Sequence, residues 1–401
     1  MKKYYVQENL YTELKYTPDV LVCGGGFAGV SAALSAAREG KQVLLLDRGF
    51  MLGGLATAGL VTIYLPLCDG LGNQVSFGIA EELLRLSVAD FCDGERGAKN
   101  WLFDRENTVR NEHAPRFEVN FNPQLFAIAA EKLLLKEGVQ ILYGTYAVGA
   151  NTQENKIKHV FAENKSGRFA IAPKAVVDCT GDADLAVFSG APTENFKQGN
   201  VLAAWYYTGG KDGYRLHTLG FCDIPDDQKT AENAPKMLLD KRFSGLCGEE
   251  ISEQMILSHA STYNDYMKQR QTDETLEIAT IATIPQLRMT RRIDGEYTLS
   301  DKEIRTYFKD SIGLVSDWRK RGPVYEVPFR TLYSAQVKNL IFAGRHTSVT
   351  DSMWDIMRVI PCCAVTGEAA GLAAAMTDDF SALDVNALQE KLLSRGVKLH
   401  I

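Results

Sequence analysis

Three glycines and one aspartate near the start of the chain have the spacing of a dinucleotide site. Gly24, Gly26 and Gly29 form the pattern G-x-G-x-x-G directly after the apolar run 20–23, and Asp47 ends a second apolar run. Glycine at these positions permits a tight turn, a close approach of the backbone to a diphosphate, and close packing of helix on strand. The Asp47 carboxylate could accept hydrogen bonds from a ribose diol. The pattern predicts dinucleotide binding, with an ordinary glycine-rich turn as the alternative.

A helix is expected at 28–39, and it would begin at these glycines. Its free N–H groups and the positive end of its dipole would face the phosphates of the ligand. Phe27 and Ala28 therefore join the expected binding residues. A second glycine turn follows the acidic strand, and the contacts expected there are Arg48, Gly53, Gly54, Leu55 and Ala56.

This second turn indicates which dinucleotide binds. An NAD domain has no evident need for it, because its nicotinamide lies across the sheet. The longer FAD needs a second place where the backbone can approach the diphosphate and the flavin. The turn therefore favours FAD, and an ordinary loop between strand and helix is the alternative.

Two later strands end in residues of the same kind. The apolar run 175–178 is followed by Thr180, Gly181 and Asp182, and the run 340–343 is followed by Gly344 and Arg345. Carboxyl ends of parallel strands meet at one crevice, so these residues should lie near Gly24 and Asp47. Asp182 could accept from a ribityl hydroxyl or cap a helix. Two further cofactor contacts are expected, from a meander at 146–172 and from the start of the last long helix: Val148 and Ile360.

The composition limits the function classes. The chain has 401 residues and a net charge of −6, and its pI is near 5.7. Together with the lack of a basic run, this argues against nucleic-acid binding. No apolar stretch reaches membrane-spanning length and the N-terminus lacks a signal peptide, so the expected location is the cytoplasm. None of the eight cysteines forms a C-x-x-C pair, and no metal site is expected.

Over most of its length the sequence resembles the FAD-dependent oxidoreductase family related to the fumarate reductase/succinate dehydrogenase flavoproteins. The segments that carry the resemblance are DVLVCGGGFAGVSAA, DRGFMLGGLATAG, AVVDCTGDADLAVFSGAP, IPQLRMTRRIDGEYTL, YEVPFRTLYSAQVKNLIFAGR and IMRVIPCCAVTGEAAGLAAA. The resemblance implies an α/β fold: a Rossmann-like FAD-binding domain, with a parallel sheet and an antiparallel meander, plus an inserted α+β substrate or cap domain. The implied FAD domain is discontinuous, 1–200 and 330–401, and the cap is 201–329.

The resemblance also bears on how FAD is held. In the fumarate reductase branch of these flavoproteins, a histidine just before the second glycine turn carries FAD covalently. This chain has Gly-Phe-Met-Leu at 49–52, so FAD should bind non-covalently. Relatives often have a histidine near the position of Asp351, whereas here the histidine is His346. The acid or base of the reaction therefore stays open between His346 and Asp351.

The candidate catalytic residues are two arginines and these two proton carriers. A guanidinium can clamp a carboxylate with two parallel hydrogen bonds, which points to Arg358 and Arg288, although a structurally paired arginine is the alternative for each. His346 or Asp351 could exchange a proton during hydride transfer.

These residues predict an FAD-dependent oxidoreductase. It would transfer a hydride between flavin N5 and a small, polar, anionic substrate. The alternative is a flavin-carrying electron-transfer subunit of a larger complex, without catalysis of its own. The electron donor or acceptor and the oligomeric state stay open.

Overall fold

The computed structural model describes residues 6–88, 118–211, 213–220, 230 and 237–401. Its centre is a parallel sheet of five short strands in the order β18 (Leu340–Phe342), β10 (Ala175–Asp178), β2 (Val20–Cys23), β3 (Val43–Leu46) and β6 (Gln140–Leu142). Four of these strands are buried at every residue, because layers cover both faces of the sheet.

Helices cover one face of this sheet. The innermost pair is α1 (Phe27–Ala37) and α8 (Ile360–Met376), which lie side by side. Glycines permit this approach: a Cβ on Gly367 would lie 2.3 Å from the carbonyl oxygen of Ala28, and one on Gly371 would lie 2.1 Å from that of Ala32. The small-residue stripe of α8 thus packs α8 on α1. Outside this pair lie α2 (Ile79–Val88) and α4 (Pro123–Lys136).

A four-stranded sheet covers the other face. Its order is β1 (Glu13–Tyr16), β9 (Gly167–Ile171), β8 (Lys156–Asn164) and β7 (Tyr146–Gln153). The pairs β7–β8 and β8–β9 are antiparallel, as the meander prediction requires, whereas β1 joins β9 in parallel. Apolar side chains from this sheet and the central sheet form one core. The fold is therefore the expected α/β arrangement of a parallel sheet with an antiparallel meander.

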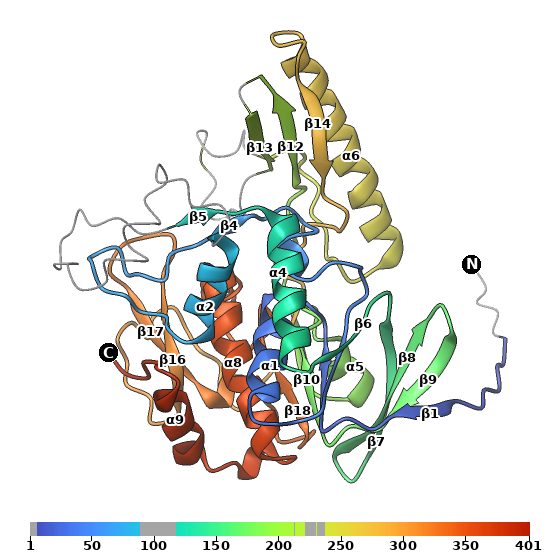
Figure 1. The fold of residues 1–401 in the computed structure, drawn as a ribbon, viewed down its shortest axis with the longest axis vertical. Helices are drawn as coiled ribbons and strands as arrows, with labels where there is room; N and C mark the ends of the chain where they lie inside the picture. The colour runs from blue at the N-terminus through green and yellow to red at the C-terminus, as the bar shows by residue number, and fades with distance from the viewer. Residues whose placement is uncertain (1–5, 89–117, 212, 221–229, 231–236) are drawn as a thin grey trace.

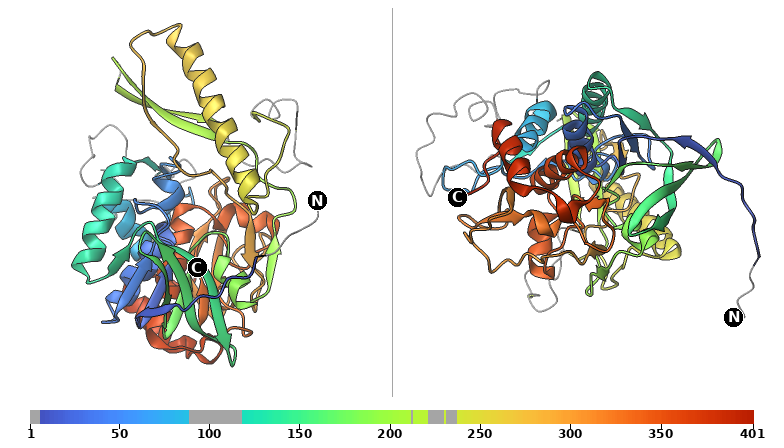
Figure 2. Two further views of the ribbon diagram at one scale, coloured as in Figure 1. Left: turned by 90° about the vertical axis from the view of Figure 1, so that its right-hand side faces the viewer. Right: turned by 90° about the horizontal axis from the view of Figure 1, so that it is seen from below.

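A separate unit stands out from this body (Figures 1 and 2). It consists of the antiparallel strands β12 (Ala204–Gly210), β13 (Gly213–Leu219) and β14 (Glu277–Ile281), together with the long helix α6 (Gly248–Arg270). The expected cap range, 201–329, extends further than this unit. β16 (Ser311–Ser316) and β17 (Val324–Pro328) fall within that range, yet their side chains belong to the core around α8.

The remaining elements connect these layers. They are η1 (Gly54–Ala56), β4 (Ile63–Tyr64), β5 (Val119–Asn120), α5 (Asp184–Ser189), β11 (Thr193–Asn195), β15 (Arg291–Ile293), η6 (Phe329–Thr331), α7 (Asp351–Met357), η7 (Phe380–Ala382) and α9 (Val385–Ser394). In the described ranges no single helix has both the length and the apolar composition to cross a membrane. Taken together, α7 and α8 have the length and apolar composition of a membrane span, but they are bent by 89° relative to each other.

Candidate functional site

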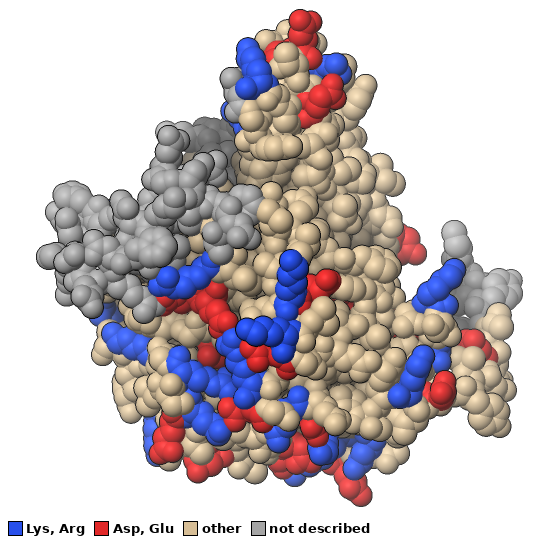
Figure 3. Space-filling view, in the orientation of Figure 1, with Lys and Arg blue, Asp and Glu red and all other residues tan. Residues whose placement is uncertain are grey.

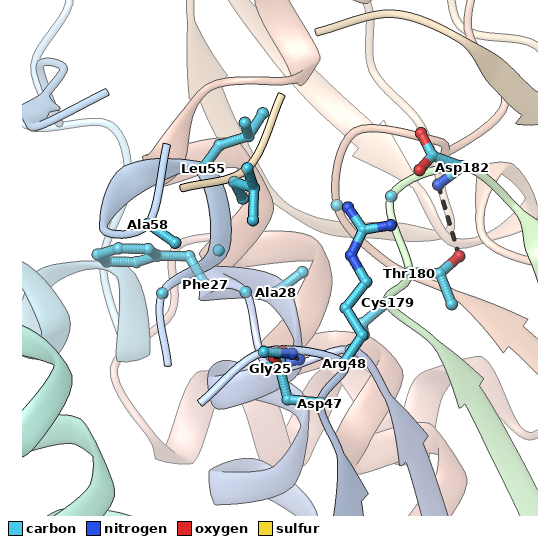
Figure 4. Close-up of a pocket in the computed structure, with 18 of the residues that line it drawn as sticks. Gly25, Phe27, Ala28, Asp47, Arg48, Leu55, Ala58, Cys179, Thr180 and Asp182 are labelled. Atoms are coloured by element: carbon cyan, nitrogen blue, oxygen red, sulfur yellow. Dashed lines mark hydrogen bonds between the residues drawn. The ribbon is translucent and has the colours of Figure 1, made fainter. Parts of the chain in front are cut away.

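A cavity of about 710 Å³ opens at the carboxyl edge of the central sheet (Figure 4). The residues that follow β2, β3, β10 and β18 all line it, because parallel strands end at the same edge. The expected cofactor residues that line it are Gly24, Gly26, Phe27, Ala28, Asp47, Arg48, Gly53, Gly54, Leu55, Ala56, Thr180, Gly181, Asp182, Gly344, Arg345 and Ile360. Gly29 and Val148 do not line it.

Each glycine of the first turn has its own geometric reason. Gly24 has φ +106°, and a Cβ there would lie 2.3 Å from the Cys179 carbonyl oxygen. A Cβ on Gly29 would lie 1.8 Å from the Gly24 carbonyl oxygen, so Gly29 serves the packing of α1. Gly26 differs, because a Cβ there meets nothing within 4 Å. Its missing side chain leaves open space in front of the uncapped N-terminus of α1, where a diphosphate would need it.

The second glycine turn lies directly against the first. Gly53 and Gly54 both have positive φ, and the Gly53 N–H donates to the Gly25 carbonyl oxygen at 2.8 Å. A Cβ on Gly54 would lie 3.2 Å from the Cα of Gly26. The two turns therefore form one continuous floor without side chains, which an ordinary loop would not need.

The acidic strand end contributes Asp47 and Arg48. The buried Asp47 carboxylate accepts from the Gly25 N–H at 2.7 Å and the Gly49 N–H at 2.6 Å, so it also holds the first turn in place. Burial raises the pKa of Asp47, although these two N–H groups oppose the shift. The Arg48 side chain extends across the cavity towards Thr180 and Asp182 (Figure 4). Among the described residues it forms no ion pair, which leaves its charge available to an anionic ligand.

Asp182 ties the central sheet to a segment of the expected cap. Its Oδ1 accepts from Arg345 Nη2 at 2.7 Å and from the Thr290 hydroxyl at 2.6 Å. Burial alone would raise the pKa of Asp182, but Arg345 and Thr290 outweigh it and hold that pKa below its ordinary value. Asp182 does not cap α5, where Asp178 accepts from the Leu185 N–H instead. Of the two sequence-based roles, capping is therefore not observed.

Neighbouring charges complete this connection. Arg291 donates to the Asp182 carbonyl oxygen at 2.9 Å and pairs with Asp184 at 2.8 Å. Burial, with the nearby charges of Asp182 and Asp178, raises the pKa of Asp184 to about 6. Arg291, from the segment IPQLRMTRRIDGEYTL, thus joins two parts of the chain.

Of the four candidate catalytic residues, only Arg358 lines the cavity. Its Nε donates to Asp355 Oδ1 at 3.0 Å, and its Nη2 contacts the same oxygen. The side chain is largely buried, at 9% exposure, beside the start of α8. The Asp355 carboxylate therefore balances part of the Arg358 charge. This is the structural pairing that the sequence analysis gave as the alternative to a catalytic role.

The structure places the other three candidates elsewhere. His346 is fully buried behind the strand end, with Nε2 3.0 Å from the Asp178 carbonyl oxygen, and burial lowers its pKa. Asp351 begins α7 and pairs with Arg292 at 2.8 Å. Arg288 is buried over the ring of Trp205, 5.4 Å from its centroid. None of the three lines the cavity, so their catalytic roles have no support from its lining and stay predictions.

Two groups of residues that line the cavity were not predicted from the sequence. Thr145 directly precedes β7, and Tyr146 and Ala147 are its first two residues, just before Val148. They follow β6, so the rule about strand ends could have found them. The protruding unit and its connection add Ile251, Thr283, Ile284, Pro285 and Leu287. No motif marks these five, because their place depends on how the unit folds over the sheet.

Comparisons with known proteins identify the family of this chain. The family model "FAD dependent oxidoreductase" matches residues 19–208 and 207–392. A vinyl phenol reductase of Lactiplantibacillus plantarum is 33% identical over 96 residues, which are 23% of this chain and 19% of that protein. A urocanate reductase of Eggerthella lenta is 33% identical over 97 residues, 21% of this chain and 16% of that protein. The chain thus matches less than a fifth of the length of either relative.

Among solved structures, a geranylgeranyl bacteriochlorophyll reductase-like protein of Thermoplasma acidophilum is similar over 95% of this chain and 82% of its own, with 13% identity and a TM-score of 0.45. Because the family model spans nearly all of the sequence, the chain belongs to the FAD-dependent oxidoreductase family. Its cofactor is FAD.

The described residues fit FAD. The cradle at Gly26 has room that a side chain would fill, and the adjoining second turn extends it. Two uncapped helix N-termini, at Phe27 and Ile360, border the same cavity, and the unpaired Arg48 enters it. All three features favour an elongated anionic ligand such as a dinucleotide.

Proposed function

We propose that this protein binds FAD non-covalently and transfers a hydride between flavin N5 and a small, polar, anionic substrate. The observation that carries the proposal is the joint lining of one cavity. Its floor is the double glycine turn, and residues of the protruding unit and its connection close over it beside Arg358. When bound, FAD supplies a hydride acceptor or donor.

The protein residues have distinct tasks in this scheme. Ile251, Ile284, Pro285 and Leu287 present apolar side chains to the cavity, which exclude water from the reacting region. The uncapped N-terminus of α8, at Ile360, stabilises negative charge in the part of the cavity that it borders. Arg358, beside that helix, holds the anionic group of the substrate.

The charge balance limits the substrate. Asp355 already balances part of the Arg358 charge. We therefore expect the substrate to place one carboxylate, and no more, beside Arg358. The substrate must be small, because the same cavity has to hold FAD as well. Curated relatives named as reductases of urocanate and of vinyl phenol support reduction of an unsaturated compound as the direction.

The absence of a covalent bond to FAD rests on the residues before Gly53. The cavity is lined there by Gly49, Phe50 and Met51, and none of these offers the histidine that holds FAD in the fumarate reductase branch. The electron donor is not identified. A sequence with a single dinucleotide fingerprint receives electrons either through the same cavity or from a partner.

An anaerobic spectroscopic experiment tests the proposal. The purified holoprotein is reduced with dithionite, and small unsaturated carboxylates are then added one at a time while the flavin absorbance is recorded. We expect at least one of them to reoxidise the flavin rapidly, and uncharged analogues of the same compound to do so much more slowly. If no small molecule exchanges electrons with the flavin while a second protein co-purifies and does, the chain is an electron-transfer subunit.

A further inference from the structure

The outer face of α6 exposes several large apolar side chains. The residues that pack on β12 and β14 include Gln254, Ser258 and Thr262, which are polar, followed by Tyr266. On the opposite side, Ile256 is 67% exposed, Tyr263 is 59% exposed and Met267 is 41% exposed. In a globular protein, large apolar side chains of a helix normally face the core.

The exposed residues have the spacing of a helix–helix seam. Ile256, Ala260, Tyr263 and Met267 follow one another at intervals of four, three and four residues, and all are exposed. This is the spacing of core positions in a coiled coil, in which each side chain fits between residues of a second helix. In the view of Figure 3, few charged side chains lie on the protruding unit between its charged tip and the body. The seam is therefore an unpartnered helix face among the described residues.

Charged residues extend the seam at both ends with opposite signs. Glu253 lies three residues before Ile256, and Arg270 lies three residues after Met267, so both continue the seam. Both are exposed, and their ion pairs within the chain lie at the surface: Glu253 with Lys241 at 2.5 Å and Arg270 with Glu277 at 3.9 Å. Arg270 also donates to the Tyr266 hydroxyl at 3.1 Å. Exposed pairs of this kind contribute little and exchange easily.

The seam is complementary to itself when a second copy runs antiparallel to it. A two-fold axis that crosses α6 between residues 261 and 262 places every seam residue opposite another one. Glu253 then faces Arg270 of the second copy, Ile256 faces Met267, and Ala260 faces Tyr263. The small Ala260 leaves space for the large Tyr263 ring. The charges match and the apolar residues meet, so the arrangement needs no other partner.

We infer that the protein forms a homodimer through antiparallel pairing of α6 with α6 of a second copy. An isologous contact of this type closes with two chains and leaves no free seam. Self-complementarity favours a second copy over an unrelated partner, because a different partner would require no symmetry in this sequence.

Sedimentation velocity of the full chain, over a range of micromolar concentrations, tests this inference. We expect a dimer for the unaltered protein and a monomer for Tyr263→Glu, because that substitution places two carboxylates in the apolar seam. Tyr214→Glu is the matched control: Tyr214 is an exposed tyrosine of the same unit, on β13 and outside the seam. This control should remain dimeric, and both variants should keep their flavin.

A charge exchange tests the antiparallel register. Glu253→Arg and Arg270→Glu should each raise the dissociation constant of the dimer about tenfold, because each dimer contains the pair twice. The double variant restores both pairs, so its dissociation constant should return to near the starting value. A monomeric unaltered protein, a dimer that survives Tyr263→Glu, or a double variant as weak as the single ones would each overturn the inference.

Discussion

Gly26 allows cofactor binding to be separated from folding. It has an extended backbone with φ −67°, which any residue can adopt, and a Cβ there meets nothing within 4 Å. The protein should therefore tolerate Gly26→Val in the absence of a ligand. A cost of about 1 kcal/mol in the free energy of unfolding is expected, because valine is a poor residue before the first turn of a helix.

The effect on FAD should be much larger. The valine side chain would fill the open space in front of the N-terminus of α1, and the diphosphate could no longer reach its N–H groups. Loss of two charge-assisted hydrogen bonds, at about 1.5–3 kcal/mol each, removes about 3–6 kcal/mol of binding free energy. The dissociation constant of FAD should rise by more than about a hundredfold.

The assay is a fluorescence titration of the apoprotein with FAD, beside a thermal unfolding curve of the same sample. Gly29→Ala is the contrasting variant. Its added Cβ would lie 1.8 Å from the Gly24 carbonyl oxygen, so this variant should lose stability as well as FAD. A Gly26→Val protein that purifies with full FAD occupancy would refute the placement of the diphosphate at this turn.

Three further variants follow from the same site and its supporting core. Asp47→Ala should weaken FAD binding by about 1.5–3 kcal/mol, measured in the same titration, and unchanged affinity would remove Asp47 from the site. Arg358→Lys should keep FAD but slow turnover at least about tenfold in stopped-flow measurements, because an ammonium cannot reproduce a two-pronged contact; equal rates would exclude Arg358 as the substrate clamp. Burial raises the pKa of Glu368 from its ordinary 4.5 to about 7. The folded state therefore retains a proton that the unfolded state releases, and the contribution of Glu368 to stability should fall as the pH rises from about 4.5 to 7. Glu368→Gln should gain about 3 kcal/mol over wild type across that window in denaturant titrations, and parallel pH profiles would contradict this assignment.

Much of the central fold could be predicted because its signals are local. The expected strands at 20–23, 43–46 and 175–178 agree with β2, β3 and β10, since each is a short apolar run that ends in glycine or an acidic residue. The start of α4 also has a local signal, because Asn122 precedes Pro123 and accepts from the Gln124 and Leu125 N–H groups.

The arginine and histidine roles depended on contacts between distant segments. His346 follows a strand end in sequence, but its side chain turns into the core beside Asp178. Arg345 meets Asp182, 163 residues away, which no local pattern reveals. The pair Arg358–Asp355 is an exception, because residues three apart on a helical turn are neighbours and could have been paired from the sequence.

The extent of the protruding unit was also beyond local signals. β16 and β17 have ordinary strand sequences, and only the core around α8 shows that they belong to the body. The lining residues Thr283, Ile284, Pro285 and Leu287 enter the site for the same reason, through the way the chain folds back over the sheet.

Release of the cofactor is the most direct test of the central claim that this cavity holds FAD without a covalent bond. The purified protein is precipitated with acid or heat, and the supernatant and the pellet are analysed by chromatography and mass spectrometry. The account predicts intact FAD in the supernatant, in an amount close to that of the protein. Flavin that stays with the pellet would contradict the non-covalent site, and a nicotinamide dinucleotide in place of FAD would contradict the account as a whole.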